Sequence, residues 1–167
     1  MYLEKEIVQW GIDRYILGPE AQGTRVGQAK KTIEEATEIL AGIIKNDHDE
    51  IKDGIGDTYV TLCMQASLCG FTMDEIERVI FPSEANPSAL GRAYNTLRHA
   101  VDILGTIAYL EQSTVQGVKT AATGCLVSLK AQASMSGYSF NECVDRAWAA
   151  IKDRKGRMVG GIFVKES

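Results

Sequence analysis

Several features are scarce in this 167-residue sequence, and each scarcity excludes a class of protein. The four cysteines lack the CxxC spacing of zinc sites, and there are only two histidines. No apolar run approaches the roughly 18 residues of a membrane-spanning helix. Lys and Arg total 18 against 22 Asp and Glu, for a net charge of −4. This balance argues against a general nucleic-acid binder, because neutralising phosphates requires an excess of positive charge.

The remaining composition is that of an ordinary soluble globule with 45% hydrophobic residues. The first six residues carry acids and no apolar stretch, so we expect no signal peptide and no membrane partner. Without a secretory context the cysteines are expected to be reduced thiols. We therefore expect a single domain over residues 1–167 in the cytoplasm, or in the host cytoplasm if a phage encodes it.

The hydrophobic pattern is helical nearly throughout, which predicts an all-α fold. Apolar residues recur every three or four positions over residues 26–44 and 51–69. Asp47 is a predicted N-cap, and Gly70 a predicted helix end. A capping box at 72–75 opens a short helix, and residues 82–88, with two prolines, predict a linker. The tail 160–165 predicts a short extended segment that closes over a site or pairs with a second subunit.

The chain then resembles itself, which indicates an internal duplication. Residues 27–40 match 91–104 at six of fourteen positions, and residues 60–75 match 127–142 at seven of sixteen. Chance similarity of two helical hairpins is the alternative, but the helix-ending glycine and the capping box recur in the same order. We therefore predict a helical bundle of two hairpin repeats, a catalytic one over 24–81 and a degenerate one over 88–157 that includes a basic C-terminal segment.

Six carboxylates fall at helical spacing in the first repeat: Glu34, Glu35, Glu38, Glu50, Asp53 and Asp57. Residues three or four apart share a helix face, so a solvated acidic face is one interpretation. However, the helix beyond Asp57 is apolar nearly all round, which predicts burial. Carboxylates that border a packed interior resist ionisation unless a cation neutralises them. An oxygen-only set suits a hard cation such as Mg2+.

The second repeat keeps the apolar framework and loses five of these six acids. The corresponding residues are Arg98, His99, Asp102, Gly117, Thr120 and Gly124. The fold therefore does not require the acids, and we expect one metal site per chain. Di-iron bundle chemistry is disfavoured, because neither His48 nor His99 follows a glutamate at the Glu-x-x-His spacing.

The acid pattern resembles the all-α nucleoside triphosphate pyrophosphohydrolases of the MazG and dimeric dUTPase superfamily, including phage-type members. Their K-x-x-E-E-x-x-E-L signature is similar to residues 31–39, with Ile39 in place of Leu. Their second motif, E-x-x-D, ends at Asp57 but meets Gly54 where the acid belongs. Asp53 lies one position earlier on the face of Asp57, and 50–53 also reads E-x-x-D. The resemblance covers the first repeat and the basic tail at 147–158.

The resemblance implies Mg2+-dependent hydrolysis (Mn2+ being the alternative ion) of a nucleoside or deoxynucleoside triphosphate to monophosphate and pyrophosphate. It implies that Glu35, Glu38 and Asp57 bind the metal together with Asp53 or Glu50. It further implies that Glu34 or Glu38 accepts the proton of the attacking water. A duplicated chain of this family can complete one site alone and still form a homodimer.

Several residues are candidates for binding the nucleotide. The resemblance implies phosphate contacts from Lys31 and from the tail residues Lys152, Arg154, Lys155 and Arg157. A solvated basic helix end is the alternative interpretation of the tail cluster. Trp10 can stack on a base with Arg14 nearby, although a core Trp and a surface Arg explain the same spacing. Trp148 is expected in the core.

Two other functions remain open at this stage. A specific dUTPase or dCTPase would share the metal site, since no motif fixes the base. A non-catalytic helical interaction module with a decayed metal site would keep the fold and lose the chemistry. The intact E-E-x-x-E over Glu34–Glu38 argues against decay.

Overall fold

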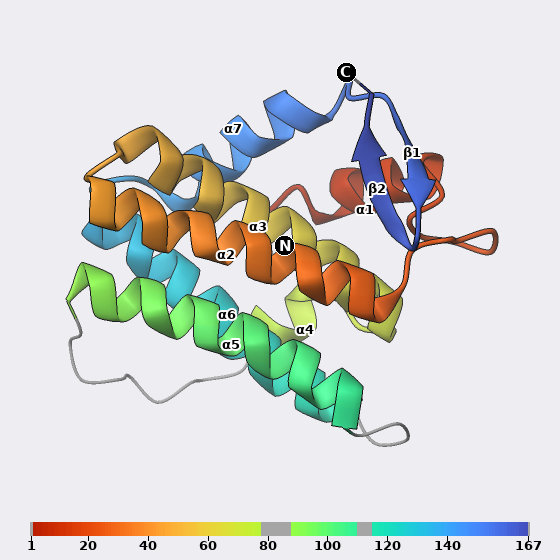
Figure 1. The fold of residues 1–167 in the computed structure, drawn as a ribbon, viewed down its shortest axis with the longest axis horizontal. Helices are drawn as coiled ribbons and strands as arrows, with labels where there is room; N and C mark the ends of the chain where they lie inside the picture. The colour runs from red at the N-terminus through yellow and green to blue at the C-terminus, as the bar shows by residue number, and fades with distance from the viewer. Residues whose placement is uncertain (1, 78–87, 110–114, 167) are drawn as a thin grey trace.

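The computed structural model describes residues 2–77, 88–109 and 115–166, and it confirms the all-α prediction (Figure 1). The predicted linker lies outside the described residues except for Ser88. The helices and strands are α1 (Glu4–Asp13), α2 (Arg25–Lys45), α3 (His48–Cys69), α4 (Met73–Glu77), α5 (Ala89–Tyr109), α6 (Val115–Met135), α7 (Phe140–Ile151), β1 (Gly156–Val159) and β2 (Ile162–Lys165).

Two antiparallel helix pairs form the body of the bundle. Helix α2 packs along α3, α5 packs along α6, and α2 also packs against α5 (Figure 1). Helix α3 is central, because it additionally contacts α1, α6 and α7. The two strands pair antiparallel and lie beside α1, near the start of α2 (Figure 1).

The predicted helix boundaries are confirmed by their hydrogen bonds. The Asp47 carboxylate accepts from the backbone N–H groups of Asp49 and Glu50 at 3.0 and 3.1 Å. Gly70 ends α3 in the left-handed conformation at φ 79°, where only glycine is unstrained. Ser139 and Glu142 form a reciprocal capping box at the start of α7.

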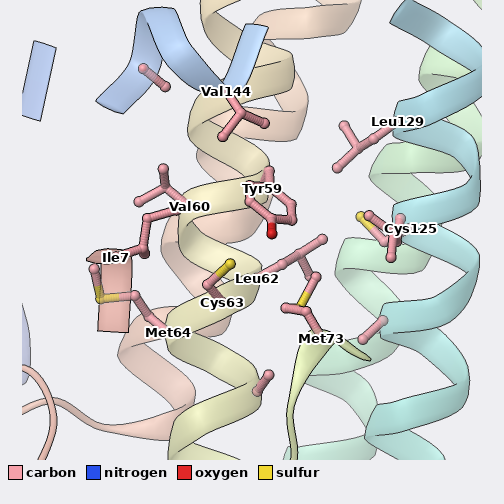
Figure 2. Packing of buried hydrophobic residues seen from close by; sticks show 14 of the residues in the cluster. Ile7, Tyr59, Val60, Leu62, Cys63, Met64, Met73, Cys125, Leu129 and Val144 are labelled. Carbon is pink, nitrogen blue, oxygen red and sulfur yellow. The ribbon is translucent and has the colours of Figure 1, made fainter. Parts of the chain in front are cut away.

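Helix α3 is buried nearly all round beyond Asp57, as its apolar sequence predicts. Tyr59, Leu62 and Cys63 have no exposed surface. Figure 2 shows Tyr59 and Leu62 on the side of α3 toward α6, and Val60 and Met64 on the side toward α1. The same helix therefore carries core residues along most of its length, with the Asp57 carboxylate among them.

Glycines bring the backbone of α3 close to its neighbours. A Cβ atom at Gly54 would lie 2.8 Å from Cγ1 of Ile39 on α2, and 2.9 Å from its backbone nitrogen. A Cβ atom at Gly56 would lie 2.2 Å from the carbonyl oxygen of Cys143 on α7. These contacts fix α2 and α7 on two sides of α3.

The helices follow the two offsets of the internal alignment. Shifting the first residue of α2 by 64 gives that of α5, and shifting the last residue of α3 by 67 gives the position next to the last residue of α6. Gln65 and Gln132, which correspond in the alignment, are both fully buried. Each side-chain amide donates to the residue four positions later, and neither Oε1 has a hydrogen-bond partner within the described structure.

The buried acceptor on Gln65 predicts a stability gain on its removal. Gln65→Met keeps the volume and removes a desolvated oxygen, so we expect the free energy of unfolding to rise by about 1 kcal/mol. Urea unfolding measures the change, with the exposed Gln116→Met on α6 as the control and no shift beyond about 0.5 kcal/mol. A loss of stability in Gln65→Met would show that the buried oxygen is satisfied.

Candidate functional site

A cavity of about 610 Å³ lies between α2, α3 and the C-terminal hairpin. One wall is acidic, with Glu34, Glu35 and Glu38 from α2 and Asp57 from α3. The structure therefore brings four of the six predicted acids to one cavity. The apolar part of the lining contains Trp10, Ile16, Val60, Met64, Ile162 and Phe163.

Asp57 is the most perturbed carboxylate of this wall. Burial, with a further contribution from the charge of Glu35, raises the pKa of Asp57 to about 7, although Arg154 opposes the shift. An additional positive charge in the cavity would favour the ionised form of Asp57 beside Glu35.

Lys31 distinguishes the two candidates for the general base. Its ammonium lies 2.7 Å from Glu34 Oε2 and 3.0 Å from Glu35 Oε1. The hydrogen bond from Lys31 lowers the pKa of Glu34. Burial and the charge of Glu35 instead raise the pKa of Glu38. In the metal-free site Glu38 is therefore the more basic of the two.

Glu50 and Asp53, between which the sequence left the fourth ligand open, are both engaged by cations. Lys45 Nζ lies 2.8 Å from Glu50 Oε1. Asp53 accepts from Nε and Nη2 of Arg146 on α7, the latter at 3.2 Å. Neither acid lines the cavity. An acid at Gly54, the position that the family motif specifies, would collide with α2.

No three His, Cys, Asp or Glu side chains among the described residues are grouped as a metal site in their present conformations. The donor chemistry of Glu35, Glu38 and Asp57 fits Mg2+, since all three offer oxygen from one wall. Burial first, and the charge of Glu35 second, raise the pKa values of Glu38 and Asp57, and a bound cation would favour their ionised forms.

The predicted basic residues separate in the structure. Arg154 lines the cavity, whereas Lys152, Lys155 and Arg157 are exposed and are not part of its lining. The alternative interpretation, a solvated basic helix end, fits Lys152, which is the exposed C-cap of α7, but it does not fit Arg157, which lies in β1. Arg14 also lies outside the lining.

Sequence reasoning missed four polar residues of the lining: Gln28, Lys30, Thr61 and Lys165. Lys30 precedes Lys31 in the signature region, and its side chain lies 3.6 Å from Glu34. Lys165 belongs to the tail, for which only an extended conformation was predicted. No local motif marks Gln28 or Thr61.

Trp10 is nearly buried and contributes to both the core and the cavity wall. Its indole N–H donates to the carbonyl of Ile151 at 2.9 Å, and its ring meets Phe163 edge-on at 5.3 Å. Its exposed fraction is 7%. The prediction of a core Trp is therefore confirmed, while stacking on a base stays a prediction. Trp148 is only partly buried.

The C-terminal tail is extended, as predicted, and pairs with β1 of the same chain. The tip of this hairpin docks on the start of α2, where Thr24 N–H donates to the Gly161 carbonyl at 3.3 Å. Five residues of the hairpin line the cavity: Val159, Ile162, Phe163, Val164 and Lys165. The hairpin is thus one wall of the candidate site.

The corresponding place in the second repeat is filled. His99 and Gly124 correspond to Glu35 and Asp57, and a Cβ atom at Gly124 would lie 2.4 Å from the His99 ring. His99 has an exposed fraction of 6%. The imidazole therefore occupies the space into which an acid at position 124 would project.

Comparisons with known proteins give one partial relative and no family. The chain is 39% identical over 64 residues to an uncharacterized 18.2 kDa protein in the rep-hol intergenic region of Haemophilus phage HP1 (strain HP1c1), which covers 38% of this chain. The match spans about a third of the phage protein (37%). No protein-family model matches. No solved structure matches.

A search for membrane spans is also negative. Across the described ranges, none of the helices combines the length and apolar character needed to cross a bilayer.

Proposed function

We propose that this protein is a Mg2+-dependent pyrophosphohydrolase that converts a nucleoside or deoxynucleoside triphosphate to its monophosphate and pyrophosphate. The observation that carries the proposal is the composition of one cavity, which combines a carboxylate wall, basic side chains and an apolar wall. These three surfaces match the metal-bound phosphates, the outer phosphates and the base of a nucleotide.

The acidic wall holds the reacting end of the substrate in this proposal. Glu35, Glu38 and Asp57 would hold Mg2+, which would supply charge neutralisation for the phosphates and a more acidic bound water. Glu34 or Glu38 accepts a proton from the attacking water, and without metal the pKa of Glu38 is raised while that of Glu34 is lowered. Water oxygen bonds to the α-phosphorus, and the bond from that phosphorus to the oxygen bridging to the β-phosphate breaks.

The other walls position the substrate. Arg154 and Lys31 line the cavity as donors for phosphate oxygens, with Lys30 and Lys165 as additional cations. Trp10, Val60 and Phe163 offer an apolar surface to the base. Specificity for dUTP or dCTP is the alternative within the same chemistry.

The cellular setting follows the same proposal. A nucleotide substrate places the enzyme in the cytoplasm, and the partial match to a phage protein makes a phage-infected host the setting of interest. We propose a homodimer as the assembly, with neither nucleic acid nor membrane as partner.

A panel of ribonucleoside and deoxyribonucleoside triphosphates with Mg2+, assayed for pyrophosphate release, tests the proposal. We expect turnover of at least one nucleotide, and the preferred base separates a general enzyme from a dUTPase or dCTPase. Glu38→Gln should reduce kcat by about 100-fold or more, the usual scale for a general base. Asp102→Asn, at the corresponding position of the second repeat, is the matched control and should retain wild-type kcat.

No turnover on any nucleotide would refute the enzyme. If Glu38→Gln and the wild type also bound Mg2+ equally, the interaction module with a decayed metal site would gain support.

A further inference from the structure

Three hydrogen-bond donors of α1 and the residue after it converge on the point where α7 ends. The Trp10 indole N–H donates to Ile151 O at 2.9 Å. Arg14 donates from Nε to Arg154 O at 2.9 Å and from Nη2 to Lys152 O at 3.2 Å. The last carbonyls of a helix have no partner within the helix, so a donor from elsewhere is stabilising there.

The Arg14 guanidinium is itself held in place. Its carbon lies 4.4 Å from the centre of the Trp10 ring, and its Nη1 is 3.5 Å from the carbonyl of the same residue. The planar fork of an arginine can bind two carbonyls at once, which a lysine ammonium at the end of a flexible chain does not reproduce. The Arg14 side chain therefore matches the bend of the backbone at residues 152–155, between α7 and β1.

The bend determines what enters the cavity. Arg154, whose carbonyl Arg14 binds, places its side chain in the lining, close enough for its charge to oppose the pKa shift of Asp57. Two residues later β1 begins, and the hairpin forms the wall that includes Phe163. A change in the path of residues 152–155 would therefore displace both a cation and a wall of the site.

We propose that Arg14 is a positioning residue, which binds the backbone carbonyls of Lys152 and Arg154 and thereby holds the Arg154 side chain and the β1–β2 hairpin against the cavity. Only the effect of Arg14 on substrate binding rests on the proposed function. The hydrogen bonds from Arg14 to the backbone form without substrate. They distinguish this role from a direct contact between Arg14 and a nucleotide.

Hydrogen exchange tests the structural half without substrate. Arg14→Lys retains the charge and one donor group, so we expect it to fold. We expect amides of residues 152–165 to exchange about tenfold faster, the scale of one to two lost hydrogen bonds. Arg98→Lys on α5 is the matched control and should leave these amides unchanged. Arg14→Gln is a second variant and should show the same local effect. Unchanged exchange in both Arg14 variants would overturn the proposal.

A double-mutant cycle tests the functional half. Arg14→Lys should raise KM about tenfold with kcat within about twofold, because it displaces the Arg154 side chain and the hairpin wall, which both contact substrate in the proposed function. In an Arg154→Ala background the same substitution should raise KM by clearly less than tenfold, because only the displacement of the hairpin wall remains. Additive effects would overturn positioning and indicate a direct contact. If the wild type turns over no nucleotide, the proposed function fails, and the exchange comparison alone decides the role of Arg14.

Discussion

Asp57→Asn is expected to abolish nucleotide turnover and, in the absence of Mg2+, to make the folded protein more stable. The loss of turnover follows from removing a carboxylate that lines the cavity on α3. Loss of a residue that only hydrogen-bonds a metal ligand already reduces activity by about 10- to 100-fold, so loss of a ligand itself should cost at least about 100-fold in kcat/KM. Pyrophosphate release at saturating Mg2+ measures this effect.

The gain in stability depends on pH, and its direction follows from the raised pKa of Asp57. Burial raises this pKa from 3.8 to about 7 in the folded state. Between these values the folded protein retains a proton that the unfolded chain has released, so wild-type stability falls as pH rises from about 4 to 7. Asparagine does not titrate, and Asp57→Asn should therefore exceed the wild type by about 2–4 kcal/mol at pH 8 and by far less at pH 4.

Urea unfolding with EDTA at pH 4 and pH 8 measures this difference. Adding Mg2+ at pH 8 should stabilise the wild type and not the variant, because a ligand that binds only the folded state raises its stability. Asp102→Asn, on an exposed position of the second repeat, is the control and should behave as the wild type. If the free energies of unfolding of Asp57→Asn and the wild type differed by the same amount at both pH values, the raised pKa of Asp57 would be contradicted.

Gly56→Ala is expected to destabilise the fold by about 3 kcal/mol, at the upper end of the cost of overpacking a core. The new methyl group would lie 2.2 Å from the Cys143 carbonyl oxygen and 2.7 Å from the Ala147 Cβ, so α7 would have to move as a unit. The flexible end of a side chain can rotate away from a clash, but this clash is with the backbone of α7, which cannot. Thermal and urea unfolding measure the loss.

The control for this prediction is Gly105→Ala on α5, where a Cβ atom would meet nothing within 4 Å. There the substitution should raise stability by about 0.5–1 kcal/mol, since alanine in a helix loses less conformational entropy on folding than glycine. If both substitutions shifted stability by the same amount and sign, close packing of α3 on α7 would not be the reason for Gly56.

Local sequence signals predicted the helices well, because each depends on neighbours in the chain. Asp47 and Gly70 bound α3 through contacts within four residues, and the capping box at Ser139 acts over three. The internal repeat then extended these predictions to the second half. The burial of α3 beyond Asp57 was predictable from its lack of charged residues.

The candidate site was harder to predict, because its composition depends on contacts between distant residues. The pairing of Asp53 with Arg146 spans 93 residues, and no spacing within the acid pattern reveals it. The signature over α2 located Glu35 and Glu38, since their spacing is local. The strand β1 was missed because the basic residues around Gly156 are equally typical of a helix end.

The filled place in the second repeat has an evolutionary consequence. If the ancestor carried acids in both repeats, no single substitution would now restore the acid pair in the second repeat. Gly124→Asp alone would collide with the imidazole of His99, and His99→Glu alone would leave an acid opposite a glycine, without its partner carboxylate. Each of these two substitutions is unfavourable until the other has occurred, so the loss of the acids from the second repeat is hard to reverse.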